Sequence, residues 1–521
     1  MLFSIHISFF LRALKLILLV ILYMTAEFIL ALDQGTSSSR AVIFDRCQQT
    51  LGMEQVEFKQ YYPSPGWVEH NPEEIWDTQL LAAKHLLKKL RLKPERIAAI
   101  GIANQRETTI VWDRETGRPI HNAIVWQDRR TADTCEWLRE QELEDYIKTT
   151  TGLVIDSYFS ATKLYWILKN IPGASKLAQQ GHLAFGTVDS WLLWKLTGGK
   201  EHATDSSNAS RTMLFNISTL QWDEKLLRTL NIPKSILPKV LPSSGLFGET
   251  AAGIFDNCSI PITGIAGDQQ SALFGQKCFD AGEVKNTYGT GCFMLMNTGS
   301  RLVNSKSGLL TTIAWQIGSD VSYALEGSVF IAGAAIKWLR DGLKIIERAS
   351  DTEEIAFSVT DSNGVYVVPA FTGLGAPYWD MYARGAILGL TQGVTDKHLV
   401  RATLESLAYQ TNDIIGIMEI DSDIKLKKLK VDGGASANSF IMQFQSDILN
   451  VDVVCSPFPE ATALGAALLA GLSIGLYQFS DLKVDIPGSK VYKPKMGVNE
   501  RNRLYSGWLK AVERAKSWAK E

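Results

Sequence analysis

The chain lacks the features that mark several specialised classes of protein. Its 521 residues include only six cysteines, the closest two fourteen positions apart, so there is no C-x-x-C pair. This argues against a zinc ribbon, a thioredoxin-type site and a dense disulfide framework, and favours reduced thiols in the cytosol. An excess of one charge is also lacking, since 53 Lys and Arg face 55 Asp and Glu. That balance argues against nucleic-acid binding by phosphate neutralisation but does not exclude a small anionic ligand.

Long hydrophobic runs are lacking as well. The apolar run near the N-terminus, Leu16–Met24, has nine residues, whereas a membrane-spanning helix needs about 20. Arg12 and Lys15 precede this run, as in the n-region of a secretion signal, yet no clear small-x-small cleavage site follows it. A signal, a weak anchor and a non-native upstream extension are the three interpretations that these residues leave open.

The composition is that of a large globular protein, with 46% hydrophobic and 21% charged residues. Disordered, collagen-like and low-complexity chains are therefore excluded. Strand and helix patterns alternate along the sequence. Residues 28–32 and 39–45 predict a hairpin, residues 73–92 a helix, and residues 98–103 and 108–112 two further strands. This is an α/β pattern with antiparallel hairpins mixed in.

A domain boundary is predicted near the middle of the chain. Residues 269–276 continue as a helix, and the polar turn at 277–283 follows it. Residues 284–288 and 292–296 then predict a second hairpin around Gly289-Thr290-Gly291, which resembles the hairpin at residues 29–44. A duplicated domain is therefore plausible, with each copy opening on a hairpin of this kind.

The usual nucleotide-binding motifs are absent. There is no G-x-x-x-x-G-K-[ST] and no H-R-D or D-F-G pair, and the Gly289 turn lacks the third glycine of a dinucleotide fingerprint. Four turns rich in Gly, Ser, Thr and Asp are present instead, at residues 33–40, 266–270, 289–291 and 432–438. Glycine lets backbone amides approach an anion, and a carboxylate at a strand end can hold Mg²⁺ or take a proton. Together the turns favour a nucleotide cleft between two related lobes.

The first of these turns, within Ala31–Arg40, resembles the opening of the carbohydrate and polyol kinase family in the actin, Hsp70 and sugar-kinase superfamily. The strings at 102–109, 264–270, 286–293 and 369–380 are similar to the branch of that family that phosphorylates glycerol. The similarity runs from about Glu27 to the C-terminus. It implies an α/β protein of two ribonuclease-H-like (actin-like ATPase) lobes, at 27–276 and 284–521, with a central nucleotide and substrate cleft.

The resemblance also implies an activity and its residues. The expected reaction is the ATP-dependent conversion of glycerol to sn-glycerol 3-phosphate in glycerol catabolism, with Mg²⁺ held by Asp33 and Asp268 as general base. The positions that match glycerol-binding residues are Arg106, Glu107, Trp126, Tyr158, Asp268, Gln269 and Phe293. The positions that match nucleotide-binding residues are Gly35, Thr36, Ser37, Arg40, Thr290, Gly291, Gly333, Lys337, Gly434 and Asn438.

Two departures from the family pattern matter. Lys337 stands where many relatives have Gln, and it either adds a phosphate contact or points to solvent. Residues 252–257 lack the glycine-rich and basic pattern linked to sugar-bisphosphate inhibition in some bacterial members, so that regulation is not expected.

Other conspicuous residues have simpler interpretations. Asp45 and Asp113 are expected to form turns, Trp191 and Trp194 to lie in the core, and no metal is assigned to the histidines at 70, 121 and 202, which fall in polar loops.

Two alternative functions are a kinase for a larger sugar such as xylulose and a non-enzymatic, nucleotide-gated module. Arg106, Glu107 and the segment around Trp126 disfavour the first, and the complete set of polyol positions disfavours the second. We expect a cytoplasmic homodimer or homotetramer with no nucleic-acid partner and no stable membrane insertion. We also expect translation to start at Met24, with residues 1–23 a non-native extension, which N-terminal mass spectrometry of the natural protein would test.

Overall fold

The computed structural model describes residues 26–457, 460–484, 486 and 488–520. Residues 1–23, which bear on the predicted start at Met24, lie outside this range. By its internal contacts the chain divides into two compact units. Unit 1 contains the described residues up to 275 together with 315–321 and 462–483, and unit 2 contains 276–314, 322–461 and the described residues from 484 on. In the described part of the chain, no helix is both long enough and apolar enough to cross a membrane.

The part of the sheet that lies in unit 1 confirms the predicted hairpin and the predicted strand at 98–103. Its order is β13 (Ser244–Glu249), β14 (Pro261–Gly267), β5 (Ile97–Asn104), β1 (Phe28–Gln34), β2 (Ser38–Phe44) and β3 (Thr50–Glu57). Strands β1 and β2 pair antiparallel from Ile29↔Phe44 to Gln34↔Ser39, whereas β1, β5 and β14 run parallel. Gln34 and Gly267 both lie opposite Asn104. Three parallel strands therefore end at one edge.

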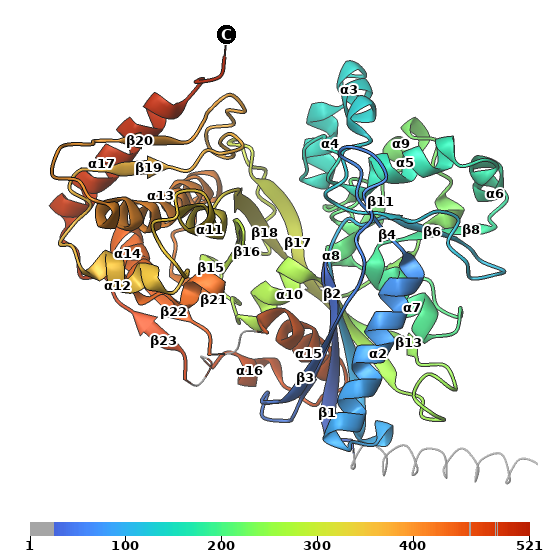
Figure 1. Cartoon of the computed structure of the whole chain (residues 1–521). Helices are drawn as coiled ribbons and strands as arrows, with labels where there is room; N and C mark the ends of the chain where they lie inside the picture. Colours follow the sequence, from blue (N-terminus) through green and yellow to red (C-terminus); the bar gives the residue numbers. More distant parts are fainter. Residues whose placement is uncertain (1–25, 458–459, 485, 487, 521) are drawn as a thin grey trace, which may run out of the picture. The chain divides into compact units, whose positions relative to one another are not determined.

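Helices cover both faces of this sheet (Figure 1). Helix α2 (Pro72–Leu90), predicted at 73–92, begins at Asn71, whose side chain accepts a hydrogen bond from the Glu73 amide. Its buried residues share a core with Ile100 and Ile102 of β5. Gly101 lies between these two residues and so faces the other side, because side chains alternate along a strand. There, a β-carbon on Gly101 would lie 2.2 Å from the Ala466 carbonyl oxygen of α15 (Ala461–Ser473).

The remaining elements of unit 1 complete its helical layers and the loops around the sheet. The predicted strand at 108–112 is confirmed as β6, and the predicted helix at 269–276 as α10. These elements are β4 (Glu69–His70), η1 (Pro94–Arg96), β6 (Ile110–Asp113), β7 (Ala123–Ile124), α3 (Ala132–Glu140), α4 (Glu144–Thr151), α5 (Ser160–Asn170), α6 (Ala174–Gln179), β8 (Leu183–Gly186), α7 (Val188–Leu196), β9 (Ala203–Asp205), α8 (Ser206–Ala209), β10 (Phe215–Asn216), β11 (Gln221–Trp222), α9 (Glu224–Thr229), η2 (Lys234–Ile236), β12 (Lys239–Leu241), α10 (Asp268–Gly275) and α16 (Phe479–Leu482).

Unit 2 contains its own run of paired strands, together with long helices. In sheet order its strands are β23 (Lys490–Tyr492), β22 (Asp452–Cys455), β21 (Lys428–Gly433), β15 (Glu283–Tyr288) and β16 (Cys292–Gly299). β18 (Asp320–Val329) pairs with β16, and both β18 and β17 (Leu310–Ile317) cross the division between the units. The other elements are α11 (Gly333–Asp341), α12 (Asp351–Phe357), β19 (Tyr366–Val368), β20 (Ala386–Leu388), α13 (Asp396–Ser422), η3 (Gly434–Ala437), α14 (Ser439–Leu449) and α17 (Val498–Ala515).

The predicted similarity of the two hairpins is confirmed. In unit 1, β1 pairs antiparallel with β2 and parallel with β5. In unit 2, β15 pairs antiparallel with β16, from Val284↔Met296 to Tyr288↔Cys292, and parallel with β21. Each unit therefore places a hairpin turn beside the carboxyl end of a parallel neighbour, which is where open α/β sheets bind ligands.

Candidate active site

The carboxyl edge of the unit 1 sheet gathers most of the predicted glycerol-binding residues. The chain leaves β1 into Gly35, leaves β5 into Gln105 and Arg106, and leaves β14 into Asp268 at the start of α10. Because Gln34, Asn104 and Gly267 are in register, these segments begin side by side. A side chain at position 267 would crowd Arg106, because a β-carbon on Gly267 would lie 2.7 Å from Cγ of Arg106.

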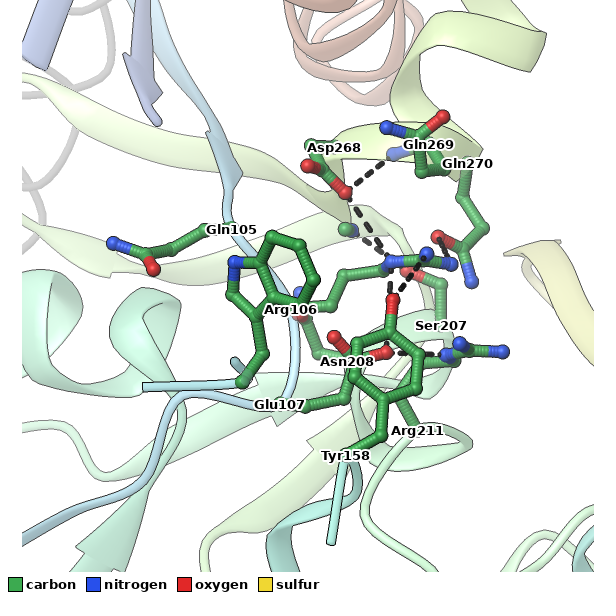
Figure 2. A network of polar contacts seen from close by, with 12 residues as sticks. Gln105, Arg106, Glu107, Tyr158, Ser207, Asn208, Arg211, Asp268, Gln269 and Gln270 are labelled. Atoms are coloured by element: carbon green, nitrogen blue, oxygen red, sulfur yellow. Dashed lines mark hydrogen bonds and ion pairs between the residues drawn. The ribbon is translucent and has the colours of Figure 1, made fainter. Parts of the chain in front are cut away.

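Arg106 is the centre of this group (Figure 2). Its side chain is buried, and its Nε lies 3.2 Å from Oδ1 of Asp268 and 3.7 Å from Oε1 of Glu107. Nη1 donates to Oε1 of Gln270 at 3.2 Å, and Nη2 donates to the Tyr158 hydroxyl at 3.4 Å. One buried guanidinium thus orients two carboxylates, an amide and a phenol around a common point.

The two carboxylates differ in their access to solvent. The side chain of Glu107 is 1% exposed, and that of Asp268 is 30% exposed. Glu107 has a left-handed backbone, with φ of 62°, and its Oε1 accepts a hydrogen bond from Nε of the buried Arg211 at 2.6 Å. Glu107 is therefore held between two guanidinium groups, whereas Asp268 keeps an open side from which a ligand can approach.

Aromatic rings form one wall of the group. The rings of Trp126 and Tyr158 meet edge to face at 5.5 Å, and the Trp126 indole donates to the Thr36 hydroxyl at 3.0 Å. Lys163 fixes the backbone of Tyr158, because its buried ammonium donates to the carbonyls of residues 157, 158 and 159. Burial lowers the pKa of Lys163 to about 7, which nearby carboxylates oppose.

The hairpin turn at Gly35–Ser37 lies against this group. Gly35 donates its amide to the Ser38 carbonyl at 2.9 Å, and Nε2 of Gln105 donates to the Gly35 carbonyl at 3.0 Å. Asp33, buried at the end of β1, lies 3.6 Å from Nη1 of Arg40. Asp33, Gly35, Thr36 and Arg40 are thus brought together, with Thr36 linked to the aromatic wall through Trp126.

Three of the residues predicted to bind the nucleotide in unit 2, Thr290, Gly291 and Gly333, lie at the second hairpin turn. The amides of Ala332 and Gly333 donate to the carbonyls of Thr290 and Gly289, so the start of α11 is fastened to the turn. A β-carbon on Gly333 would lie 2.6 Å from the Gly289 carbonyl oxygen. Gly433 lies opposite Tyr288 at the ends of β21 and β15, so the segment that begins at Gly434 starts at the same edge.

Other predicted residues are placed as follows. Asn438 caps α14 by accepting from the Ile441 amide, and its amide donates to the Thr352 hydroxyl. Lys337 is exposed on α11, and Phe293 is half-buried on β16. The backbone amide of Gln269 donates to Oδ1 of Asp268 at 2.7 Å.

The turn role expected for Asp45 and Asp113 and the core position expected for Trp191 and Trp194 are confirmed. Asp45 and Asp113 accept backbone amides in turns, and Trp191 and Trp194 pack against the buried Trp112. The polar-loop assignment is wrong for His70, which is fully buried in β4. In the described part of the chain, no group of three or more His, Cys, Asp or Glu is arranged to hold a metal ion.

Three of the contacts described above involve residues that were not predicted from the sequence. Arg211 donates to Glu107, Gln270 accepts from Arg106, and Gln105 donates to the Gly35 carbonyl. Gln270 and Gln105 adjoin predicted residues, so proximity in sequence could have indicated them. Arg211 is 104 residues from Glu107, and only the dense run of small polar residues at 204–212 hints that this segment has a role.

The fold and the group at its edge define a kinase of small hydroxylated substrates. Residues 28–275 match the N-terminal domain, and residues 284–474 the C-terminal domain, of the FGGY family of carbohydrate kinases. The chain belongs to the FGGY family of carbohydrate kinases, and the predicted α/β class with two related lobes is confirmed.

Within this family the chain falls among the glycerol kinases. It is 59% identical to the glycerol kinase of Carboxydothermus hydrogenoformans over 499 residues, covering 96% of this chain and 100% of that protein. It is 58% identical to glycerol kinase 2 of Thermotoga maritima over 495 residues, covering 95% and 100%. The structure of Plasmodium falciparum glycerol kinase with ADP matches with a TM-score of 0.89 at 39% identity, covering 94% and 98%. The xylulose kinase of Lactobacillus acidophilus, at 22% identity and a TM-score of 0.84, shares the fold.

Proposed function

We propose that this enzyme transfers the γ-phosphoryl group of ATP to a terminal hydroxyl of glycerol, giving sn-glycerol 3-phosphate and ADP. The observation that carries the proposal is the group around Arg106, in which a partly exposed Asp268 and a buried Glu107 share one guanidinium beside Tyr158. A triol needs paired donors and acceptors, and these side chains supply both. The glycerol kinases to which the chain is similar support this choice of substrate over xylulose.

Asp268 is the proposed general base. Its Oδ1 is oriented by Nε of Arg106 and by the Gln269 amide, while its side chain stays partly open. A hydroxyl nucleophile needs a base within hydrogen-bond reach, and positioning supplies much of the remaining rate. Arg106, Glu107 and Tyr158 bind the hydroxyls of glycerol, Gln269 lies beside them, and Trp126 and Phe293 cover the carbon backbone.

The nucleotide is proposed to use the two hairpin turns and the start of α11. Backbone amides and hydroxyls at Thr36, Ser37, Thr290 and Gly291 are suited to phosphate oxygens, because oriented donors stabilise developing charge without reorganising. Gly35, whose amide donates to the Ser38 carbonyl, is proposed to let the first turn come close to the phosphates. Arg40 lies near the phosphates, and the adenosine side takes Gly333, Lys337, Gly434 and Asn438. The segment 27–276 thus serves glycerol and phosphate, and the segment 284–521 serves adenosine.

Mg²⁺ is the proposed metal, and Asp33 would hold it. A single carboxylate buried at a strand end fits this ion, which commonly takes one or two protein carboxylates together with waters and substrate phosphates. When bound, the ion neutralises charge on the phosphates. Arg40, 3.6 Å from Asp33, keeps that carboxylate compensated in the absence of the ion.

Assembly and location follow the same proposal. An enzyme that uses ATP and supplies glycerol phosphate to metabolism is proposed to act in the cytoplasm, as a homodimer or homotetramer, without a nucleic-acid partner. Light scattering coupled to size-exclusion chromatography distinguishes these assemblies from a monomer.

An assay of ADP release with glycerol, with xylulose and with no acceptor tests the activity. We expect rapid release with glycerol only. Release that does not depend on an acceptor would contradict the proposal, and a preference for xylulose would reassign the substrate.

A further inference from the structure

Asp205 is a buried acid that none of the roles above uses. It is fully buried at the end of β9, and it caps the short helix α8. Its carboxylate accepts from the amides of Ser207 and Asn208, from the Asn208 side chain, and from the hydroxyls of Ser207 and Ser243, at 2.6–3.0 Å. Burial raises the pKa of Asp205 above its ordinary value, and these donors oppose the rise.

One of these donors connects Asp205 to the proposed base. The Ser207 hydroxyl accepts the Gly267 amide at 3.0 Å and donates to Oδ1 of Asp205 at 3.0 Å. An amide can only donate and a carboxylate can only accept, so the hydroxyl has one allowed orientation. Gly267 is the last residue of β14, and Asp268 follows it directly. The backbone that carries Asp268 is therefore tied to Asp205 through one serine.

The same helix connects to the segment that carries Arg106 and Glu107. The side-chain amides of Asn208 and Asn104 donate to each other, both at 3.0 Å, and Asn104 ends β5 two residues before Arg106. Arg211 follows α8 and donates to Glu107 at 2.6 Å. Figure 2 shows Ser207, Asn208 and Arg211 beside Asp268, Arg106 and Glu107.

We propose that Asp205 and Ser207 are positioning residues for phosphoryl transfer, which hold Asp268 at the distance from Arg106 that the reaction requires. Asp205 fixes α8 by its cap. Ser207 of α8 then holds the segment after β14, and Asn208 and Arg211 hold the segment after β5. Both side chains are fully buried, so the proposed role of each is to act through Asp268 and not on glycerol itself. The inference rests on the proposed function, because it takes Asp268 as the base.

Two serines provide a matched test. Ser207 and Ser243 are both fully buried, and both hydroxyls donate to Asp205. Only the Ser207 hydroxyl also accepts the Gly267 amide. S207A and S243A therefore each remove one hydroxyl from the same carboxylate, and only S207A cuts the connection to Asp268. Melting temperature, kcat, and KM for ATP and glycerol are measured for both, with D205N as a third variant.

We expect S207A to lower kcat by about 10- to 100-fold, because small misplacements of a reacting group carry losses of this order. KM for ATP should stay within about twofold, and S243A should keep kcat near the wild-type value at a similar melting temperature. Because D205N and S207A act on the same connection, the double variant should lose little more than the worse single one.

Equal kcat values for S207A and S243A, or losses that follow melting temperature alone, would overturn the inference. If S207A is too unstable to assay, kcat is measured for D205N and for S207T, which restores the hydroxyl. A wild-type kcat in D205N would also overturn the inference. A wild-type enzyme that does not phosphorylate glycerol would instead contradict the proposed function, so the two failures are distinguishable.

Discussion

Asp268 and Glu107 share Arg106 but lie in different surroundings, and this difference separates their expected roles. Glu107 is enclosed by two guanidinium groups, whereas Asp268 retains an open side. A base must meet the hydroxyl it deprotonates, so Asp268, the partly exposed acid, suits that task. The enclosed acid suits the binding of a hydroxyl whose position must not change.

Substitution of each acid by its amide should separate the two roles. We expect D268N to lower kcat by about 10²–10⁴-fold, the usual range for loss of a general base. E107Q should act mainly on KM for glycerol, because it weakens a binding contact. Steady-state kinetics with glycerol as the varied substrate measures kcat and KM for both variants. Near wild-type turnover in D268N would show that Asp268 is not the general base.

His202 makes stability depend on pH. Its Nδ1 must accept from Nη2 of Arg114 at 2.9 Å, and Nε2–H donates to the Phe185 carbonyl at 2.8 Å, so the ring is neutral. Burial lowers the pKa of His202 to about 4 from 6.5. Between these values the unfolded chain binds the proton and the folded protein does not, so stability is lost as pH falls from about 6.5 to 4.

The contribution of His202 to the change in unfolding free energy with pH should reach at most about 1.4 kcal/mol per pH unit. Urea unfolding at a series of pH values should show a weaker dependence over this range in H202Q than in the wild type. H85Q, at an exposed histidine on α2, serves as the control and should keep the wild-type slope. An unchanged slope in H202Q would contradict the assignment.

At the scale of elements, glycines let α15 approach the sheet and α10. A β-carbon on Gly101 would lie 2.2 Å from the Ala466 carbonyl oxygen, and one on Gly264 would lie 2.4 Å from the Ala470 amide nitrogen. In return, a β-carbon on Gly465 of α15 would lie 1.8 Å from the Ser271 carbonyl oxygen. Backbone meets backbone at these places, so no side chain can move aside.

Two helical glycines should respond in opposite ways. G465A should destabilise unit 1 by about 1–3 kcal/mol or more, as overpacking does. Gly416, within α13, has no atom within 4 Å of a β-carbon, so G416A should stabilise by about 1 kcal/mol through helix propensity alone. Denaturant unfolding of both variants tests the two predictions. A G465A variant as stable as G416A would show that α15 can shift away from Ser271 without loss of stability.

The elements show where prediction from sequence works. The hairpins at 28–45 and 284–296 and the helix at 73–92 are visible because alternation, helical spacing and turn residues are local signals. The connection from Asp205 through Ser207 to Gly267 is invisible, because residues 60 apart meet only after folding. Nothing local marks the polar run at 204–212 as buried rather than as a surface loop.

At the scale of the whole molecule, segments that are far apart in the sequence pack in the same unit. The division into 27–276 and 284–521 stays a prediction, and the structure adds that 462–483 pack with unit 1. Since α15 and its contacts with Gly101 and Gly264 come from that late segment, a fragment of residues 26–275 leaves part of its sheet bare. We expect it to aggregate or to unfold without a sharp transition.

A fusion that joins residues 462–483 to this fragment by a flexible linker should restore cooperative unfolding. Circular dichroism on heating, together with dye binding to exposed apolar surface, compares the two proteins. A cooperative transition in the 26–275 fragment alone, at the temperature of the fusion, would show that α15 is dispensable for unit 1.

The late return of the chain to unit 1 has a consequence for its synthesis. After residue 275, about 200 more residues must be made before α15 is complete, which takes roughly 10–40 s at a ribosomal rate of 5–20 residues per second. During that interval the face of β5 and β14 around Gly101 and Gly264 has no permanent cover. The nascent chain therefore passes through a period in which this face of its first sheet is uncovered, and pauses in translation between these two points lengthen that exposure.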